Sequence, residues 1–204
     1  MSTTIDGTAG VTFPAGGVGN PAGAVVGTTD TQTLTNKTIS SASNTVSTII
    51  LGTPVASTSG VSIDFTGIPA TAKRVTISFK GVSTSGTSDF LFQIGDSGGI
   101  EASGYLSSGS QSNATASTYT TGFGFTNGGG AAGVYHGTIT LVLESSAGAT
   151  WCAAGVFAET DVARMFSSAG SKSLSPGPLD RVRITTVNGT DTFDAGEINI
   201  TYES

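Results

Sequence analysis

From about residue 61 onward, apolar and polar residues alternate along several short runs of the chain. The segments 61–65 (VSIDF) and 75–79 (VTISF) each place every second side chain on one apolar face. A period of two residues is typical of a β-strand with one buried face. Similar runs predict further strands at 90–94, 119–125, 134–143, 150–157, 182–187 and 198–202.

Clusters of turn-forming residues separate these runs, such as 83–88, 127–130 and 171–178. Short strands at this spacing, without long helical patterns between them, indicate an antiparallel sandwich or barrel. About eight strands fit a jelly-roll-like arrangement. Only the short segment 158–165 favours a helix. We therefore expect an all-β fold, with a β-sandwich distal domain over residues 51–204.

The N-terminal region has a different composition. Residues 1–60 contain three charged residues and one aromatic residue, Phe13, and seven glycines occur by Gly27. So little apolar mass does not offset the conformational entropy of ordering an isolated segment. We expect residues 1–50 to form an extended Gly/Thr-rich stem or attachment segment. Its apolar residues, such as Leu34 and Ile39, lack partners within one chain, so association of several copies would bury them. A flexible linker is the alternative.

Charge is scarce throughout the chain. Charged residues make up 11% of the sequence, against about 25% in an ordinary soluble domain. The net charge is −6, with only eight Lys and Arg. Nucleic-acid binding requires clustered basic residues, so we expect no nucleic-acid partner. No apolar run approaches the roughly 20 residues of a membrane span, and the first residues lack the pattern of a signal peptide. We expect no membrane insertion.

The inventory of reactive side chains offers little for catalysis. A Ser–His–Asp triad would depend on the only histidine, His136, and no G-x-S-x-G motif accompanies it. One His and one Cys do not supply a usual zinc site. Carboxylates for glycoside hydrolysis are present, but solvated loop and edge charges are the simpler interpretation. Asn188, Asp191 and Asp194 have the oxygen ligands that calcium favours, although Asn-Gly at this position favours a turn. We expect no cofactor, no metal and no enzymatic activity.

Aromatic residues alternate with hydroxyl and amide side chains between residues 105 and 127. Exposed aromatic faces among such groups suit contact with a sugar or a protein surface. Tyr105, Tyr119 and Asn127 are therefore candidate receptor-contact residues. The alternative is that Tyr119, Phe123 and Phe125 simply face the core of the sandwich.

Two stretches resemble bacteriophage tail-fibre and related virion fibre proteins. Within residues 27–39, the run TDTQTLTNKTI resembles a segment that recurs in such fibres between an attachment region and a distal domain. Residues 191–203 (DTFDAGEINITYE) look like the closing strand of β domains in phage fibre proteins. The resemblance implies a virion location, a β-rich distal domain and a homotrimer. It also marks Thr31, Leu34, Asn36 and Ile39 as stem or virion-attachment residues.

The resemblance and the composition together predict a structural virion fibre, on the tail or the head, that is assembled in the bacterial cytoplasm. The stem would contact other virion proteins, and the distal domain would attach to a host-surface glycan or protein. A capsid-decorating or adaptor protein without receptor binding is the alternative. A polysaccharide-degrading tailspike is a minor one.

Overall fold

The computed structural model describes residues 4–6, 10–12, 38, 49–128, 130–147, 149–175 and 177–203. Backbone contacts divide the chain into two units, Met1–Val46 and Ser47–Ser204. In the first unit, β1 (Thr4–Asp6) and β2 (Gly10–Thr12) pair antiparallel, with Ile5 opposite Val11.

Short strands and one 3₁₀ turn make up the second unit. In chain order they are β3 (Ile49–Leu51), β4 (Val55–Ala56), β5 (Ile63–Thr66), β6 (Arg74–Thr84), β7 (Phe90–Asp96), β8 (Gly99–Ile100), β9 (Leu106–Gln111), β10 (Ser117–Tyr119), β11 (Phe123–Phe125), η1 (Gly130–Ala132), β12 (Tyr135–Ser145), β13 (Thr150–Glu159), β14 (Arg164–Ser173), β15 (Arg181–Thr186) and β16 (Phe193–Glu203). Because β3 pairs with β16, the sandwich includes Ile49 and Ile50, which the sequence placed in the stem.

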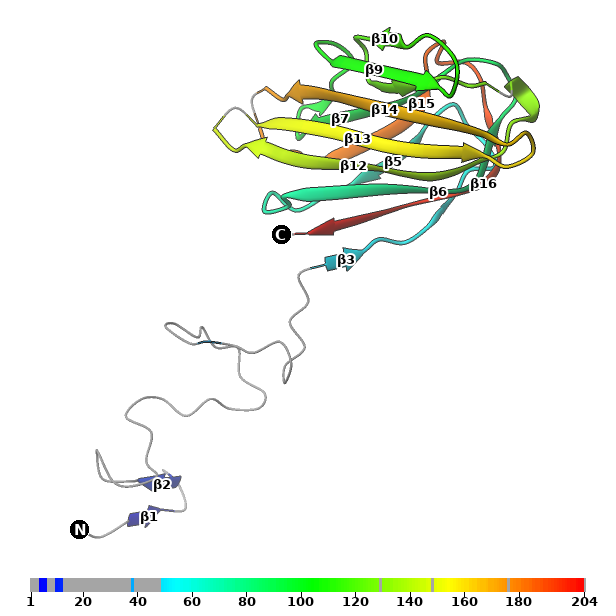
Figure 1. Ribbon diagram of the computed structural model, residues 1–204. Helices are drawn as coiled ribbons and strands as arrows, with labels where there is room; N and C mark the ends of the chain where they lie inside the picture. The colour runs from blue at the N-terminus through cyan, green and yellow to red at the C-terminus, as the bar shows by residue number, and fades with distance from the viewer. Residues whose placement is uncertain are drawn as a thin grey trace. The chain divides into compact units, whose positions relative to one another are not determined.

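Two antiparallel sheets form the sandwich. The large sheet has the order β10-β9-β14-β13-β12-β6-β16-β3, and β4 also pairs with β16. The small sheet has the order β11-β7-β15-β5, and β8 also pairs with β7. Figure 1 shows the sheets as two layers, with β12, β13 and β14 in front of β7, β15 and β5. The predicted all-β antiparallel sandwich is confirmed.

The strand order is that of a jelly roll. Its eight strands in chain order are β3 with β4, then β5, β6, β7, β11, β12, β15 and β16. The large sheet then has the order one, eight, three, six, and the small sheet has the order two, seven, four, five. Two nested Greek keys give this topology. Two insertions, β9–β10 and β13–β14, widen the large sheet beyond β12.

Alternation of side chains explains how the strands face the core. In β6, Val75, Ile77 and Phe79 are buried, whereas Arg74 and Lys80 at the ends of this run are exposed. β7 is buried along its whole length, because the segment before β11 covers its outer face. Gln93 of β7 donates a hydrogen bond to the Thr121 carbonyl in that segment. Buried and more exposed residues therefore alternate along residues 74–80 of β6, whereas both faces of β7 are buried.

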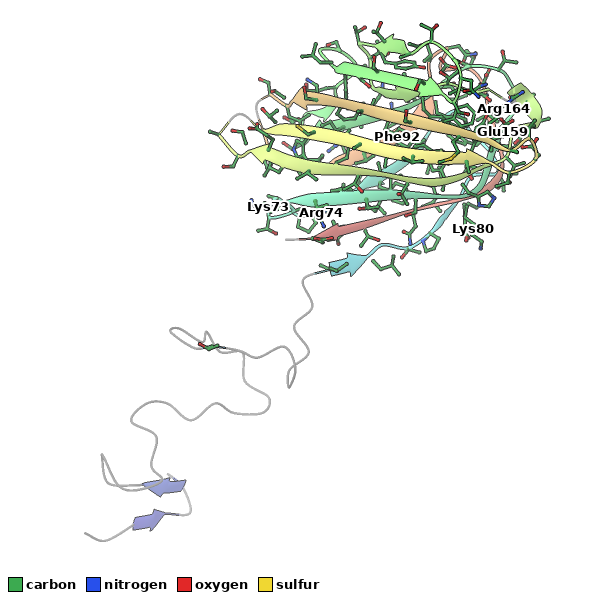
Figure 2. The ribbon with its side chains drawn as sticks, in the orientation of Figure 1. Lys73, Arg74, Lys80, Phe92, Glu159 and Arg164 are labelled. Carbon is green, nitrogen blue, oxygen red and sulfur yellow. The ribbon has the colours of Figure 1, made fainter. Side chains whose placement is uncertain are left out.

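Aromatic rings from both sheets fill the centre of the sandwich. The Phe125 ring of the small sheet stacks on Phe157 of the large sheet, with ring centroids 4.3 Å apart. Phe92, also of the small sheet, stacks on Phe157 with ring centroids 5.6 Å apart. It lies between the sheets (Figure 2). Phe79 contacts all three rings. Burying each such ring contributes about 1.5–3 kcal/mol to stability.

The segment 158–165, the only one whose sequence favoured a helix, is not helical. Residues 158 and 159 end β13, residues 160–163 form a turn, and Arg164 begins β14. Met165 pairs with Ala158 across that hairpin. The segment resembles a helix in composition only, because its residues complete a strand ladder on both sides of the turn.

Replacing Phe125 with Ala tests the aromatic centre. Phe125 is fully buried, so the variant loses the transfer free energy of the ring and leaves a cavity. We expect the free energy of unfolding, measured by urea denaturation, to fall by about 3–5 kcal/mol. Thr66→Ala, on an exposed position of β5, is the control and should change it by less than about 0.5 kcal/mol. A Phe125→Ala effect as small as that of the control would contradict this account of the core.

Candidate functional site

The two ends of the sandwich carry different features. The described chain joins the large sheet at Ile49, which pairs with Glu203 beside Arg74; this is termed the near end. The loops 85–89, 126–134, 160–163 and 187–192 gather at the opposite end, termed the far end. Figure 2 shows Arg74 at the near end and Arg164 at the far end.

Asp89 and Asn127 fasten loops of the far end to one another. The Asp89 carboxylate accepts hydrogen bonds from the Tyr119 hydroxyl and from the Asn127 backbone N–H, both at 2.8 Å. The Asn127 side-chain amide donates to two carbonyls of the β6–β7 loop. Its carbonyl oxygen accepts from the Tyr135 hydroxyl at 2.6 Å. A carboxylate that accepts two such bonds holds its donors more strongly than a neutral acceptor would.

The β15–β16 turn is tied to the same loops. Asp191 accepts a hydrogen bond from the Ser88 backbone N–H at 2.9 Å, and the Asn188 N–H donates to the Ser88 hydroxyl at 3.0 Å. The Thr192 N–H donates to the Ser85 hydroxyl, also at 3.0 Å. Three of the four loops at the far end are therefore cross-braced into one surface.

The prediction that Tyr105, Tyr119 and Asn127 are exposed contact residues is wrong. Their side chains are 1%, 7% and 8% exposed, respectively. The alternative, in which the aromatic residues of this segment face inward, is confirmed, because Phe123 and Phe125 are fully buried as well. The hydroxyl groups of Tyr105 and Tyr119 and the side-chain amide of Asn127 each form hydrogen bonds within the protein.

The outermost side chains of the far end are small and mostly polar. Exposed positions in the loops include two valines, Val162 and Val187, 44% and 51% exposed, and one carboxylate, Asp161. The others are hydroxyl, amide, alanine and glycine residues: Ser85, Thr87, Ala131, Ala132, Thr160, Ala163, Asn188, Gly189, Thr190 and Thr192. Hydroxyl and amide groups on a rigid frame can donate and accept hydrogen bonds to a polar surface. This composition suits weak contact with hydroxyl-rich ligands.

The turn interpretation of residues 188–194 is confirmed. Asn188 Oδ1 accepts hydrogen bonds from the backbone N–H groups of Thr190 and Asp191, at 3.0 and 3.1 Å. Asp194 lies elsewhere and contacts the Ser83 hydroxyl. The three oxygen-bearing side chains of the calcium hypothesis are therefore not brought together. Over the described part of the chain, no group of three His, Cys, Asp or Glu could hold a metal.

A pocket of about 460 Å³ opens at the near end. Its walls come from the β12–β13 turn, the segment before β6 and the β14–β15 loop, and include Leu143, Leu174 and Leu179. Lys73 and the nearly buried Trp151 also line it. Among the described residues, the Trp151 Nε1–H has no hydrogen-bond partner. The pocket combines apolar walls with one cation, and no pair of carboxylates lies in it.

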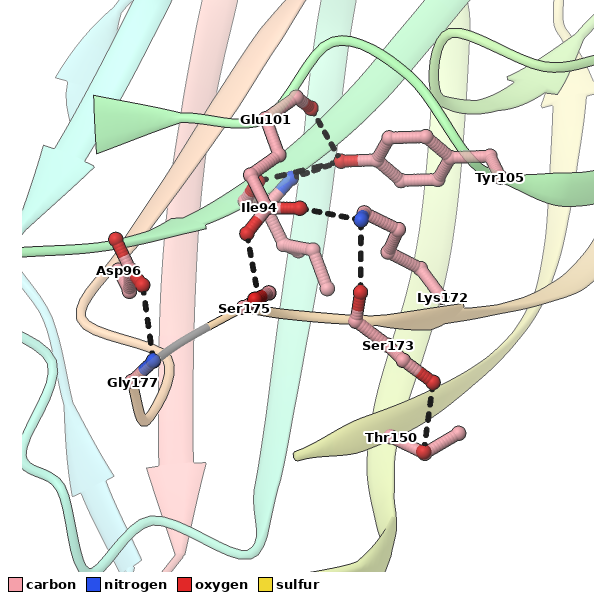
Figure 3. A network of polar contacts seen from close by, with 9 residues as sticks. All are labelled: Ile94, Asp96, Glu101, Tyr105, Thr150, Lys172, Ser173, Ser175 and Gly177. Carbon is pink, nitrogen blue, oxygen red and sulfur yellow. Dashed lines mark hydrogen bonds and ion pairs between the residues drawn. The ribbon is translucent and has the colours of Figure 1, made fainter. Parts of the chain in front are cut away.

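A buried lysine lies beside the β14–β15 loop, and Figure 3 shows its polar contacts. Lys172 is 7% exposed; its ammonium forms an ion pair with Glu101 and donates to the Ser173 carbonyl at 2.7 Å. It also lies over the Tyr105 ring, 5.6 Å from the centroid. The Tyr105 hydroxyl accepts from the Ile94 N–H at 2.7 Å and donates to the Glu101 carbonyl at 2.9 Å. Burial raises the pKa of Tyr105 well above its usual range.

Two carboxylates hold the β14–β15 loop against β7 and β8. Glu101 accepts from the Ser175 backbone N–H at 2.9 Å, and Asp96 accepts from the Gly177 N–H at 3.0 Å. Asp96 also caps its own turn through the Gly98 N–H at 2.7 Å. These carboxylates serve as loop clamps.

Other carboxylates that sequence inventory offered for hydrolysis are also engaged in structural contacts. Asp64 pairs with Arg183 in two hydrogen bonds of 2.7 Å each, and Glu159 pairs with Arg164 at 3.3 Å. His136 Nδ1 accepts from the Gly81 backbone N–H at 3.3 Å. The apolar run 149–154 around Cys152 favours a buried thiol, but Cys152 is exposed on the outer face of β13.

No family model, curated protein or solved structure matches the chain. Among the described residues, no helix has the length and apolarity required to cross a membrane. The stem residues Thr31, Leu34, Asn36 and Ile39 lie outside the described residues.

Titration of Tyr119 should be visible in the pH dependence of stability. Burial, and secondarily the neighbouring Asp89 carboxylate, raises the pKa of Tyr119 from 10.0 to about 12. The folded chain therefore keeps a proton that the unfolded chain loses near pH 10, so this contribution is complete below pH 10 and disappears as pH rises towards 12. We expect the loss of unfolding free energy between pH 9 and pH 11.5 to be smaller in Tyr119→Phe than in the wild type. Equal losses of unfolding free energy in the two proteins would contradict a raised pKa of Tyr119 in the folded state.

Removing the Lys172 ammonium should destabilise the sandwich. Lys172→Met keeps the length of the side chain but leaves Glu101 without its cation. We expect denaturant unfolding to show a loss of about 1.5–3 kcal/mol, the usual range for hydrogen bonds to charged groups. Lys80→Met removes the cation of an exposed pair with Glu197 and should have no measurable effect. Equal behaviour of the two variants would exclude a structural role for the buried pair.

Proposed function

We propose that the chain is a structural fibre protein of a bacteriophage particle. In this proposal the N-terminal segment attaches to other virion proteins and the jelly roll is displayed outward. The observation that carries the proposal is the order of the parts. A Gly/Thr-rich segment with the fibre-like run TDTQTLTNKTI directly precedes a β-sandwich of very low charge.

A homotrimer is the proposed assembly of the fibre. The chain joins the sandwich through β3, whose residues Ile49, Ile50 and Leu51 are 57%, 43% and 71% exposed. Among the described strands, β3 lies at the end of the large sheet beside β16. Exposed apolar residues on a sheet edge favour association with further copies, and they continue the apolar positions of the preceding stem.

Attachment to a host-surface glycan or protein is the proposed role of the far end. The far end is proposed as the binding end because it lies at the other end of the strands from Ile49, where the described chain enters the sandwich. Its braced loops offer hydroxyl and amide groups at fixed positions, which avoids the entropy cost of ordering loops on binding. Weak contacts from several copies on one particle would add up through multivalency.

A purely structural role, as a capsid-decorating or adaptor protein, is the second candidate. One observation favours it. The large apolar side chains that are exposed among the described residues include no aromatic residue, although aromatic anchors dominate many recognition surfaces. Enzymatic cleavage of surface polysaccharide is the least supported role, since the carboxylates serve as loop clamps and ion-pair partners.

Competition for adsorption separates the first two candidates. Purified full-length protein is added to host cells, and the adsorption rate of the phage that encodes it is measured. We expect inhibition at sub-micromolar concentration, and at least a tenfold weaker effect for Ala131→Arg at the far end. Ala147→Arg, an exposed alanine at the near end, is the matched control and should inhibit like the wild type. Folded wild-type protein that does not inhibit would favour the purely structural role.

A further inference from the structure

The outer face of the large sheet carries four successive rows of uncharged side chains across β12, β13, β14 and β9, and the exposed Glu144 lies beyond these rows at the near end of β12. The four rows are termed the uncharged face. They consist of Val142, Cys152, Ser171 and Leu106; Thr140, Ala154, Ala169 and Ser108; Thr138, Val156, Ser167 and Ser110; and His136, Ala158 and Met165.

Several apolar side chains on this face are exposed to solvent. Leu106 is 76% exposed, Met165 57%, Val156 51% and Val142 41%. Polar side chains normally occupy the solvated face of an antiparallel sheet. A contiguous exposed apolar patch on a soluble protein marks an interaction surface or an aggregation hazard. The uncharged face therefore has the features of a covered surface.

Charge distinguishes this face from the rest of the sandwich surface. On the neighbouring strands β6 and β16, ion pairs stand at the two ends of the sheet, Arg74 with Glu203 and Lys80 with Glu197. The outer face of the small sheet carries the pair Asp64–Arg183. Oppositely charged partners would find no counter-charge on the uncharged face. Two copies of this chain, each with a net charge of −6, can approach there without placing carboxylates opposite one another.

The uncharged face is large enough to supply about half of a subunit interface. Four strands at about 4.8 Å spacing and about 7 residues of 3.3 Å each span roughly 440 Å². A stable interface buries about 800 Å² per partner, and the exposed apolar residues Ile49 and Leu51 of β3 belong to the same sheet. Small residues such as Ala154 and Ala169 let two sheets pack closely, about 10 Å apart.

We propose that the uncharged face packs against a second copy of this chain. The inference rests on the proposed function, in which several copies form one fibre, and adds the sandwich itself as a subunit interface. The single cysteine, Cys152, lies on this face in the row of Val142 and Leu106 and is exposed in one chain. Assembly would cover its thiol, which makes the cysteine a chemical probe of the interface.

The test uses the full-length chain in two measurements. Sedimentation equilibrium compares the wild type with Val156→Glu, which adds a charge to the face, and with Thr66→Glu on the outer face of the small sheet as the matched control. We expect Val156→Glu to raise the dissociation constant at least tenfold and Thr66→Glu to leave it unchanged. Circular dichroism confirms that each variant is folded.

Alkylation of Cys152 with iodoacetamide provides the second measurement. In the assembled wild type and in Thr66→Glu, we expect a rate at least tenfold below that of Val156→Glu. An oligomer whose Cys152 reacts as fast as that of Val156→Glu would overturn this inference alone and leave the fibre proposal intact. A monomeric wild type would overturn the inference together with the proposed homotrimer. If the full-length protein does not compete with the phage for adsorption, that result contradicts host attachment and leaves the proposed interface unaffected.

Discussion

Packing of aromatic rings between the two sheets is the interaction on which the rest of the sandwich depends. Phe79, Phe157 and Phe166 enter from the large sheet, and Phe92 and Phe125 enter from the small one. Most other residues of the chain are small or polar, so these rings supply a large share of the apolar area that folding buries. Phe125 contacts rings of both sheets, so it holds the two layers together at their centre. Contacts between loops connect the layers at their ends.

Three tyrosines connect the interior of the sandwich to the loops through hydrogen bonds. The rings of Tyr105 and Tyr135 pack among the phenylalanines, and the buried Tyr119 lies beside them. Their hydroxyls reach Glu101, Asn127 and Asp89, respectively. Loops tied in this way lose little further entropy when they meet a partner, which is the physical basis for assigning attachment to the far end. The sheet face between the two ends is free of charge, and this leaves it for contact between copies.

Alternation of apolar residues was sufficient to predict β5, β6, β7, β12, β13, β15, β16 and the sandwich itself. It ran β10 and β11 together as one strand over 119–125. It was insufficient for β14, whose inward positions are Phe166, Ser168, Gly170 and Lys172. Only one of these is large and apolar, so the period of two is hidden. β9 is hidden for a similar reason, since its most apolar residue, Leu106, faces outward.

The candidate site was less predictable than the fold. A pattern of aromatic and polar residues between 105 and 127 does not reveal whether the aromatic rings point outward. The structure shows that their polar groups find partners in loops distant in sequence, such as the bond between Tyr119 and Asp89. The uncharged outward rows across four strands became visible only after the register aligned these residues.

The location of the protein on phage particles tests the central claim most directly. Antibodies raised against the full-length chain would be applied to purified, intact particles of the phage that encodes it, and gold labelling would be recorded by electron microscopy. The account predicts label on the outside of the particle, at fibres of the tail or the head. Intact particles without label, with the protein detected only in the unassembled fraction of the lysate, would contradict it.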